Sequence, residues 1–405
     1  MKETKKILEI SPIIVKNVGG VRRDFGHLVN MNNIEDVSNR YQIIWDLGRR
    51  CSYSCSYCPP HRNNKTSSFI DYSTLCSTMD KVAEYSYLYD SFRQKPAKKK
   101  LSFTGGEPTV HPEFFSFLEY IKDNFPEFSR GLTTNGWFND KILDKVKKLT
   151  TGGTLSYHCE ATPKMKEKVV NNSIALRDNF KVNVMFHKDF FDECVKVCDT
   201  LQKNNVNFIP RIIGDEEVDE KAIEMGYAHR YTRNQMSWFR NYWKELGQET
   251  AETGFSQKGL GRPCCGGRCF KADGLDSYFL SDTNFYGWSC MVNWFFLFLN
   301  SELDIVYTHQ TCSVNLEGKV APLGKISDFN KIIDELGDYL FSKKIPMIKC
   351  PKNFCGCGMC ITKSKTDISQ MFDRHTIKEL SFYDQKQRKS NFESDLTVKK
   401  IFESL

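Results

Sequence analysis

Residues 51–58 read Cys51-Ser52-Tyr53-Ser54-Cys55-Ser56-Tyr57-Cys58, shortly after an apolar stretch at residues 43–47 that predicts a strand. Three thiolates on one tight loop can hold three irons of a cubane [4Fe–4S] cluster and leave the fourth iron open for a ligand. A zinc knuckle, a disulfide loop and a chance spacing are the other interpretations. Structural zinc sites favour paired CxxC elements that supply four ligands, whereas this loop supplies three. The spacing therefore favours a catalytic cluster.

A second motif follows about fifty residues further along the chain. Leu101-Ser102-Phe103-Thr104 predicts a strand, and it runs into Gly105-Gly106-Glu107-Pro108. Paired glycines at the end of a strand let the backbone approach a ligand closely, because no Cβ intervenes. The carboxylate and the exposed carbonyls of this segment suit an ammonium group. Alone, the segment would be an ordinary turn, but at this distance from the cysteine loop it indicates another part of the same site.

These two motifs resemble those of the radical S-adenosylmethionine (SAM) superfamily, and the resemblance covers roughly residues 41 to 213. In that family three cysteines bind a [4Fe–4S] cluster whose open iron is chelated by SAM. The resemblance implies that Cys51, Cys55 and Cys58 are the metal ligands and that Tyr57 lies near the adenine. It also implies that the methionine amino group is held by Gly105, Gly106, Glu107 and Pro108.

The resemblance further implies an activity. The reduced cluster passes one electron to the sulfonium of SAM and breaks its S–C5′ bond, and the resulting 5′-deoxyadenosyl radical abstracts hydrogen from a substrate. The hard chemistry then belongs to the cluster and the cofactor, while the protein supplies positioning and excludes water. A reducing partner such as a flavodoxin or a ferredoxin is expected to deliver the electron.

Short apolar, β-rich stretches alternate with helical patterns through the same region. The strands are expected at residues 43–47, 101–103, 131–133, 154–157, 182–186 and 206–213. The helices are expected to begin near Ser73, Pro112, Asp140, Thr162 and Asp189. This alternation predicts an α/β fold, a partial (βα)6 TIM-like barrel with a Cys-rich C-terminal α+β extension. Active sites in such sheets lie at the carboxyl ends of the strands, where both motifs are placed.

Polar residues at the next two strand ends are further candidates. Thr133-Thr134-Asn135-Gly136 matches the TNG turn of the family, which implies that Asn135 faces the cofactor, although an Asn-Gly turn needs no function. Ser156 corresponds in the family to a strand position that contacts the SAM ribose. His158 and Glu160 follow at the barrel mouth and are candidate catalytic residues that orient substrate or carry a proton. Alternatively, His158 hydrogen-bonds a loop and Glu160 lies on the first turn of a helix.

The C-terminal third contains nine cysteines, more than packing explains. They are Cys264, Cys265, Cys269, Cys290, Cys312, Cys350, Cys355, Cys357 and Cys360. Two expected strands, at residues 294–299 and 304–307, lie between Cys290 and Cys312. This pattern resembles the auxiliary-cluster extensions of radical SAM enzymes, the SPASM and the shorter Twitch domains. The match is partial, because Leu323 stands where relatives often carry a cysteine.

The resemblance to these extensions implies one auxiliary [4Fe–4S] cluster. Its ligands would come from Cys290, Cys312, Cys350, Cys355, Cys357 and Cys360. A structural zinc ion suits a four-cysteine site equally well. The number of auxiliary clusters and the roles of Cys264, Cys265 and Cys269 stay open.

Composition indicates a reducing compartment. The chain has 405 residues, 16 cysteines and a formal net charge of +7. The N-terminus lacks the apolar stretch of a signal peptide, and the most apolar run, residues 294–299, is far too short to cross a bilayer. We therefore expect a cytoplasmic protein without membrane association, whose cysteines are metal ligands rather than disulfides. The charge allows a nucleic-acid partner but does not indicate one, and Lys98–Lys100 are expected to form a solvated sheet edge.

The sequence divides into five parts. They are an N-terminal extension (1–40), a radical SAM partial barrel (41–213), a helical linker (214–262), a Cys-rich auxiliary-cluster domain (263–362) and a polar C-terminal tail (363–405). The linker is expected to contain a helix that is capped by Thr232 and packs an aromatic stripe, including Phe239, against the barrel; a substrate lid is the alternative.

These patterns together predict a radical SAM enzyme that acts on a peptide or a small molecule. The alternative is a non-catalytic metal-binding scaffold or partner protein on the same fold. The complete cysteine motif and the intact Gly-Gly-Glu-Pro segment favour the enzyme, because a degenerate scaffold would be free to lose either. About forty residues precede the first barrel strand, too few for an independent leader-peptide-binding domain at that end, which weakens the peptide hypothesis.

Overall fold

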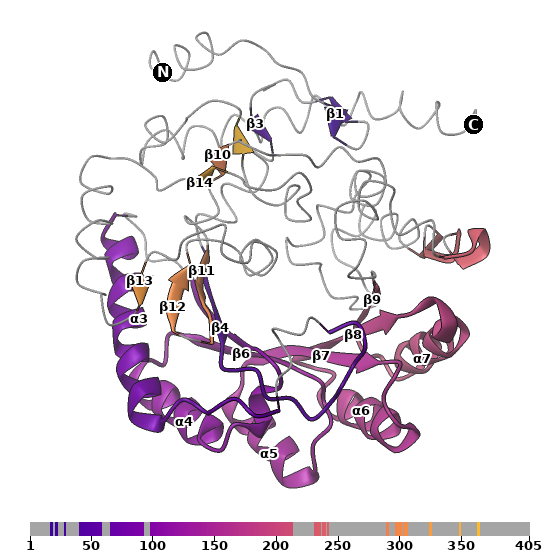
Figure 1. Cartoon of the computed structure of the whole chain (residues 1–405), viewed down its shortest axis with the longest axis horizontal. Helices are drawn as coiled ribbons and strands as arrows, with labels where there is room; N and C mark the ends of the chain where they lie inside the picture. Colours follow the sequence, from indigo (N-terminus) through magenta and orange to yellow (C-terminus); the bar gives the residue numbers. More distant parts are fainter. Residues whose placement is uncertain are drawn as a thin grey trace.

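A computed structural model describes the barrel region and short segments of the rest of the chain (Figure 1). The described residues are 17–18, 21–22, 28–29, 40–58, 65–92, 98–213, 231–235, 237–239, 241–242, 289–290, 296–301, 303–306, 324–325, 348–349 and 363–364. None of the helices in these ranges is both long enough and apolar enough to cross a bilayer.

A nine-stranded sheet is the centre of the structure, and six of its strands are parallel neighbours in chain order. They are β4 (Arg40–Asp46), β5 (Lys98–Thr104), β6 (Ser129–Thr134), β7 (Gly152–His158), β8 (Phe180–Phe186) and β9 (Phe208–Ile212). The expected partial barrel of six strands is confirmed. Five of these strands begin two or three residues earlier than expected. The added residues include Arg40, Lys98 and Ser129, which pair through the backbone but carry no apolar signal.

Five helices connect the six strands and form an arc along one side of the sheet (Figure 1). They are α3 (Tyr72–Phe92), α4 (Phe114–Asn124), α5 (Asp140–Leu149), α6 (Pro163–Ala175) and α7 (Phe191–Lys203). The side chains of Trp45, Phe103 and Phe117 are fully buried where the first strands meet α4. Thr162 caps α6, since its hydroxyl accepts the amide N–H of Met165 at 3.4 Å.

The two faces of β7 differ in chemistry because successive side chains point in opposite directions. Leu155 and Tyr157 are buried, and the Tyr157 hydroxyl donates to Glu193 of α7 at 2.6 Å. Ser156 and His158 alternate with them and are only partly buried. These two side chains therefore lie on the face of the sheet away from the helices, which is the inner face of the barrel.

The hairpin expected in the C-terminal third is present, but it belongs to the barrel sheet. Its strands are β11 (Phe296–Leu299) and β12 (Asp304–Val306), and β13 (Gly324–Lys325) pairs with β12. β11 runs parallel to β4, with Leu299 opposite Trp45. The sequence places this hairpin among the cysteines of the C-terminal third, whereas in the fold β11 covers the edge of β4. An edge strand otherwise presents unpaired N–H and C=O groups.

Short strands from both ends of the chain make two further sheets. One is β14 (Ile348–Lys349), β10 (Ser289–Cys290), β15 (Lys363–Ser364) and β3 (Leu28–Val29), in that order. The other pairs β1 (Asn17–Val18) with β2 (Val21–Arg22).

Lys99 lies in the barrel sheet, and the helix after Thr232 packs against the barrel. The lysine run lies on β5, an internal strand, and Lys99 is buried where it pairs with Asp90, so the expected solvated edge is wrong for this residue. The helix expected after Thr232 is confirmed in the described part: the Thr232 hydroxyl accepts the Gln235 amide, and Phe239 is fully buried 5.1 Å from the ring of Phe186.

Candidate active site

The cysteine loop and the Gly-Gly-Glu-Pro segment are in direct backbone contact. The amide of Gly106 donates to the carbonyl of Gly48 at 2.7 Å, and the amide of Glu107 donates to the carbonyl of Arg50 at 2.7 Å. A Cβ atom on Gly106 would lie 2.2 Å from the Arg50 oxygen, and one on Gly105 would lie 2.5 Å from the Gly48 oxygen. The glycine pair is thus required by the approach of these two strand ends, and the predicted contact with a ligand stays a prediction.

Glu107 connects the ends of β5 and β6. One of its carboxylate oxygens accepts from the amide and hydroxyl of Thr109 and from the hydroxyl of Thr134, at 3.1, 2.7 and 2.8 Å. The other oxygen accepts the amide N–H of Asn135 at 2.6 Å. The side chain is buried, and burial raises the pKa of this carboxyl although the hydrogen bonds oppose the shift. Its acceptor capacity is largely taken up by the protein.

Asn135 joins β6 to the first half of the cysteine loop. Its side-chain amide donates to the hydroxyl of Ser52 at 2.8 Å and lies 3.8 Å from the sulfur of Cys51. Its carbonyl oxygen accepts the Trp137 amide at 3.0 Å, which closes the turn, and Gly136 takes a φ of +73° there. The structure therefore brings Asn135, predicted to face the cofactor, to the first cysteine of the motif.

His158 and Glu160 both contact the second half of the cysteine loop. The Tyr57 hydroxyl lies 2.7 Å from Nδ1 of His158, and the sulfur of Cys55 lies 3.5 Å from the same nitrogen. Glu160 accepts the amide N–H of Ser56 at 2.7 Å and, through its other oxygen, the Ser56 hydroxyl. Glu160 precedes α6 by three residues, so the alternative that places it on the first helical turn is wrong, whereas His158 does bond a loop.

Burial decides the charge states of His158 and Tyr57. It lowers the pKa of His158 to about 4, against the opposing effect of the Glu160 carboxylate, and it raises the pKa of Tyr57. At neutral pH the imidazole is therefore uncharged and the phenol keeps its proton. Tyr57 and Nδ1 of His158 therefore share a hydrogen bond between two neutral groups, and the tautomer of the imidazole sets which of them donates.

The three cysteines of the motif are free thiols on one loop, each partly buried. The Cys51 sulfur accepts the Tyr53 amide at 3.4 Å, and the Cys58 amide donates to the Cys55 carbonyl at 3.1 Å. Burial raises the pKa of Cys51 and raises that of Cys55 to about 12. Nowhere in the described ranges do three His, Cys, Asp or Glu side chains converge on one metal ion. The thiolates of a cubane bind different irons and do not converge on a point.

Ser156 lies on the inner face of β7, opposite Asn183 of β8 in the strand register. It is two residues before His158 on the same face, so its side chain projects into the barrel below the cysteine loop. The predicted auxiliary ligands are placed less completely. Only the backbone of Cys290, in β10, falls within the described residues, while Cys312, Cys350, Cys355, Cys357 and Cys360 lie outside them.

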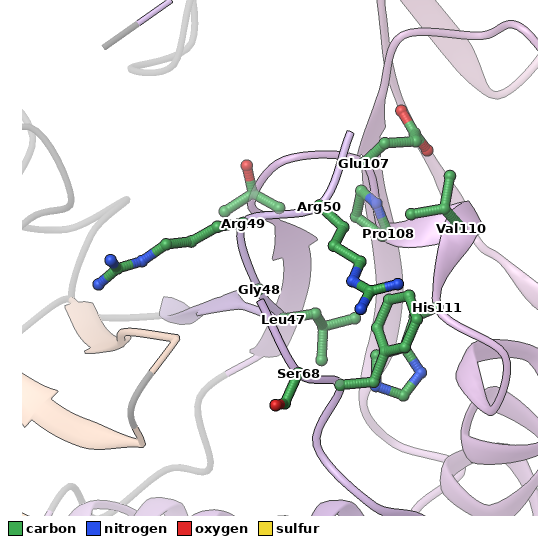
Figure 2. Close-up of a pocket in the computed structure, with 11 residues that line it drawn as sticks. Leu47, Gly48, Arg49, Arg50, Ser68, Glu107, Pro108, Val110 and His111 are labelled. Atoms are coloured by element: carbon green, nitrogen blue, oxygen red, sulfur yellow. The ribbon is translucent and has the colours of Figure 1, made fainter. Parts of the chain in front are cut away.

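A shallow hollow lies behind the cysteine loop, with about 250 Å³ of space including open solvent (Figure 2). The guanidinium of Arg50 points toward His111 and lies 4.4 Å above the ring of Phe69, while Arg49 points away. Glu107 and Pro108 line the hollow, but none of the three cysteines does. The lining of the hollow therefore includes neither the contact of Asn135 with Cys51 nor that of His158 with Cys55.

Residues 45–225 match the radical SAM superfamily. This stretch is a radical SAM domain. The domain covers the cysteine loop and all strand ends that contact it. Sequence reasoning found these strand ends but missed Ser52 and Ser56 as the loop residues that bind Asn135 and Glu160. Their only signal is that small hydroxyl residues separate the cysteines, and such residues readily bond nearby polar groups.

Curated relatives match parts of the domain. The chain is 30% identical over 98 residues to a GTP 3′,8-cyclase of Sulfurovum sp. (strain NBC37-1), covering 24% of this chain and 28% of that protein. It is 29% identical over 140 residues to the GTP 3′,8-cyclase of Aquifex aeolicus (strain VF5), covering 34% and 40%. It is 24% identical over 105 residues to an S-adenosylmethionine-dependent nucleotide dehydratase of Selenomonas ruminantium, covering 25% and 33%. The chain thus spans less than half the length of each.

Solved structures resemble a larger share of the chain at lower identity. Native anSMEcpe with bound AdoMet and Cp18Cys peptide is 16% identical, with a TM-score of 0.47, over 88% of this chain and 99% of that one. Streptococcus suis SuiB bound to the precursor peptide SuiA is 13% identical, with a TM-score of 0.45, over 73% and 64%.

Proposed function

We propose that the chain is a radical SAM enzyme that holds a [4Fe–4S] cluster on Cys51, Cys55 and Cys58 and acts on a peptide or a small molecule. With SAM bound, a reduced cluster at these cysteines would supply one electron, which would break the S–C5′ bond of SAM to give methionine and a 5′-deoxyadenosyl radical that abstracts hydrogen from the substrate. The observation that carries the proposal is the set of contacts around three free thiols on one loop, to which the ends of β5, β6 and β7 all bond. A scaffold that had lost the chemistry would not need to keep them.

The donors around the sulfurs fit a cluster. The amide of Tyr53 donates to the Cys51 sulfur, and the Asn135 side-chain amide faces the same sulfur. N–H groups directed at cysteine sulfurs stabilise the negative charge of thiolate-bound iron. Because burial raises the pKa of Cys51 and Cys55, both thiols are protonated in the apoprotein, and cluster assembly must release those protons.

The protein's own groups would then position and shield the reactants. Since Glu107 is committed to Thr109, Thr134 and Asn135, the backbone carbonyls of Gly105 and Gly106 are the acceptors left for an ammonium group in this segment. Ser156 projects from the inner face of β7 toward the same space and would bind a sugar hydroxyl. His158 contacts the Tyr57 hydroxyl and the sulfur of Cys55, so we assign it the part of orienting these groups through hydrogen bonds.

We also propose an auxiliary metal site in the C-terminal third. β10 contains Cys290, which pairs with Ile348 of β14, the strand that precedes Cys350 in the sequence. The other side of β10 pairs with β15, where Cys290 is opposite Lys363, three residues after Cys360. This pairing supports a shared site for Cys290 and the Cys350–Cys360 segment, with iron–sulfur and zinc both compatible with cysteine ligands.

The experiment that tests both proposals measures iron, zinc and 5′-deoxyadenosine. Wild-type protein and the triple variant Cys51/Cys55/Cys58→Ala are reconstituted anaerobically and assayed with SAM and a strong reductant. We expect the triple variant to lose all SAM cleavage while it keeps the metal of the auxiliary site. A wild-type protein that holds iron but does not cleave SAM would support the scaffold. A triple variant without any metal would contradict the auxiliary site.

A further inference from the structure

The cysteine loop is held in two halves by different strand ends. The first half, up to Ser52, bonds to the ends of β5 and β6 through Gly106, Glu107 and Asn135. In the second half, Ser56 and Tyr57 bond to residues that follow or end β7. A cubane cluster requires fixed distances among its cysteine ligands, so the two halves must be held in register with each other.

We propose that Glu160 and His158 are positioning residues that dock the second half of the cysteine loop on the end of β7. Through Ser56 and Tyr57 they would set the distance of Cys55 and Cys58 from Cys51. This proposal rests on the proposed function, because it assigns Glu160 and His158 to the loop that holds the cluster. It differs from a role in which either residue transfers a proton to substrate.

The geometry of Glu160 suits this role. Its two oxygens receive the amide and the hydroxyl of one residue, Ser56, so the carboxylate fixes both the position and the rotation of that residue. Ser56 is next to Cys55 and two residues before Cys58. The carboxylate is itself held in a short connection, in which the Ala161 amide donates to the His158 carbonyl at 3.1 Å before Thr162 caps α6.

His158 adds a second contact beside the first. Its ring stacks on that of Tyr57, with centroids 5.9 Å apart and an angle of 20°, and meets Tyr53 edge-on at 5.4 Å. One imidazole therefore touches aromatic residues from both sides of Cys55. The bond to the Tyr57 hydroxyl needs one hydrogen-bonding atom at the place of Nδ1, and a side-chain amide there could supply either a donor or an acceptor.

The test measures how firmly the iron is held, which requires no SAM. Variants Glu160→Gln and Ser56→Ala are reconstituted, and the rate at which a strong ferrous chelator removes iron is recorded. Iron that remains in the Cys51/Cys55/Cys58→Ala variant is subtracted. Glu167→Gln is the matched control, because Glu167 is an exposed carboxylate on α6 and the change in charge is the same.

We expect Glu160→Gln to release iron about tenfold faster than wild type, as loss of one charge-assisted hydrogen bond implies, and Glu167→Gln to match wild type. Ser56→Ala keeps the amide bond to Glu160 and should fall between them. The electron paramagnetic resonance spectrum of the reduced cluster should broaden in Glu160→Gln. His158→Asn should retain the wild-type rate more closely than His158→Ala.

Equal iron release and equal spectra in wild type, Glu160→Gln and Ser56→Ala would overturn the proposal. If circular dichroism shows that Glu160→Gln does not fold, the iron-release rate of Ser56→Ala, which removes one of the two contacts to Glu160, tests the proposal instead. If only the proposed function fails, the wild type would hold iron but form no 5′-deoxyadenosine, and the variants would still release iron faster than the wild type. That result differs from failure of the positioning proposal, in which all variants release iron at the same rate.

Discussion

Replacing Gly106 by alanine tests whether the glycine pair serves the protein or a ligand. The new Cβ would lie 2.2 Å from the Arg50 carbonyl oxygen and 2.6 Å from that of Arg49, whereas real Cβ atoms essentially never come within 3.0 Å of such an atom. The two backbone segments must therefore separate by at least 0.8 Å, the difference between 2.2 and 3.0 Å. Backbone oxygens cannot rotate away as the end of a side chain can.

This separation stretches two hydrogen bonds that are now 2.7 Å long, from Gly106 to Gly48 and from Glu107 to Arg50. The two bonds contribute about 1 kcal/mol each and the crowding costs about 1–3 kcal/mol more, so we expect a loss of about 3–5 kcal/mol in the free energy of unfolding. Because Cys51 directly follows Arg50, iron binding on reconstitution should fall as well.

The assay is urea unfolding of the apoprotein, with Gly131→Ala as the matched control. A Cβ on Gly131 would lie 3.1 Å from its nearest neighbours, so the surroundings need to yield by only a few tenths of an ångström. We expect that variant to lose about 1 kcal/mol or less. If apo Gly106→Ala unfolds at the same urea concentration as wild type and loses only SAM cleavage, the glycines serve the ligand and our reasoning is refuted.

Three further outcomes are expected. Burial lowers the pKa of His111, so protonation of this residue favours the unfolded state. The free energy of unfolding of the wild type should therefore fall as the pH drops below the usual histidine pKa near 6.5. In urea titrations at several pH values, His111→Asn should show a smaller dependence of that free energy on pH. Asn172 donates to two buried backbone carbonyls after β6, at 2.8 and 3.0 Å, so Asn172→Ala should cost about 2 kcal/mol or more in thermal or urea unfolding. Asn135→Asp places a carboxylate beside the sulfur of Cys51, so a redox titration of the reconstituted cluster should show a more negative potential than for Asn135→Ala.

The order and faces of the barrel strands followed from the sequence because they depend on local patterns. Apolar stretches mark the strands, Thr162 with Pro163 marks the start of α6, and paired glycines mark a close approach. Which loops meet at the strand ends depends on distances across the sheet, which no local pattern encodes. For that reason the contact of Gly106 with the carbonyl of Arg50 was not predicted, while the ligand contact of the glycine pair stays a prediction.

Side chains whose partners lie on other strands were the least predictable. Glu107 was expected to face an ammonium group, but four donors from Thr109, Thr134 and Asn135 surround its carboxylate. Lys99 was expected at a solvated edge, but β5 is internal and Asp90 of α3 lies within reach. A polar residue in an apolar strand indicates that a partner exists, because an unpaired buried charge is costly, but does not identify that partner.

The pairing of β11 with β4 gives the C-terminal third a physical connection to the cysteine loop. β4 leads into that loop, and β11 is hydrogen-bonded along it from Gln42 to Trp45. Ser301 lies in the turn of the hairpin, and its hydroxyl accepts a hydrogen bond of 3.3 Å from Nε of Arg49. Arg49 is two residues before Cys51 in the sequence. A displacement of the hairpin must therefore move either the β4 backbone or the loop, since a hydrogen-bonded ladder slips only in steps of whole residues. Cys290 of β10 precedes the start of β11 by six residues in the sequence, so we expect metal bound at the proposed auxiliary site to influence the cysteine loop through β11 rather than through contact with the substrate.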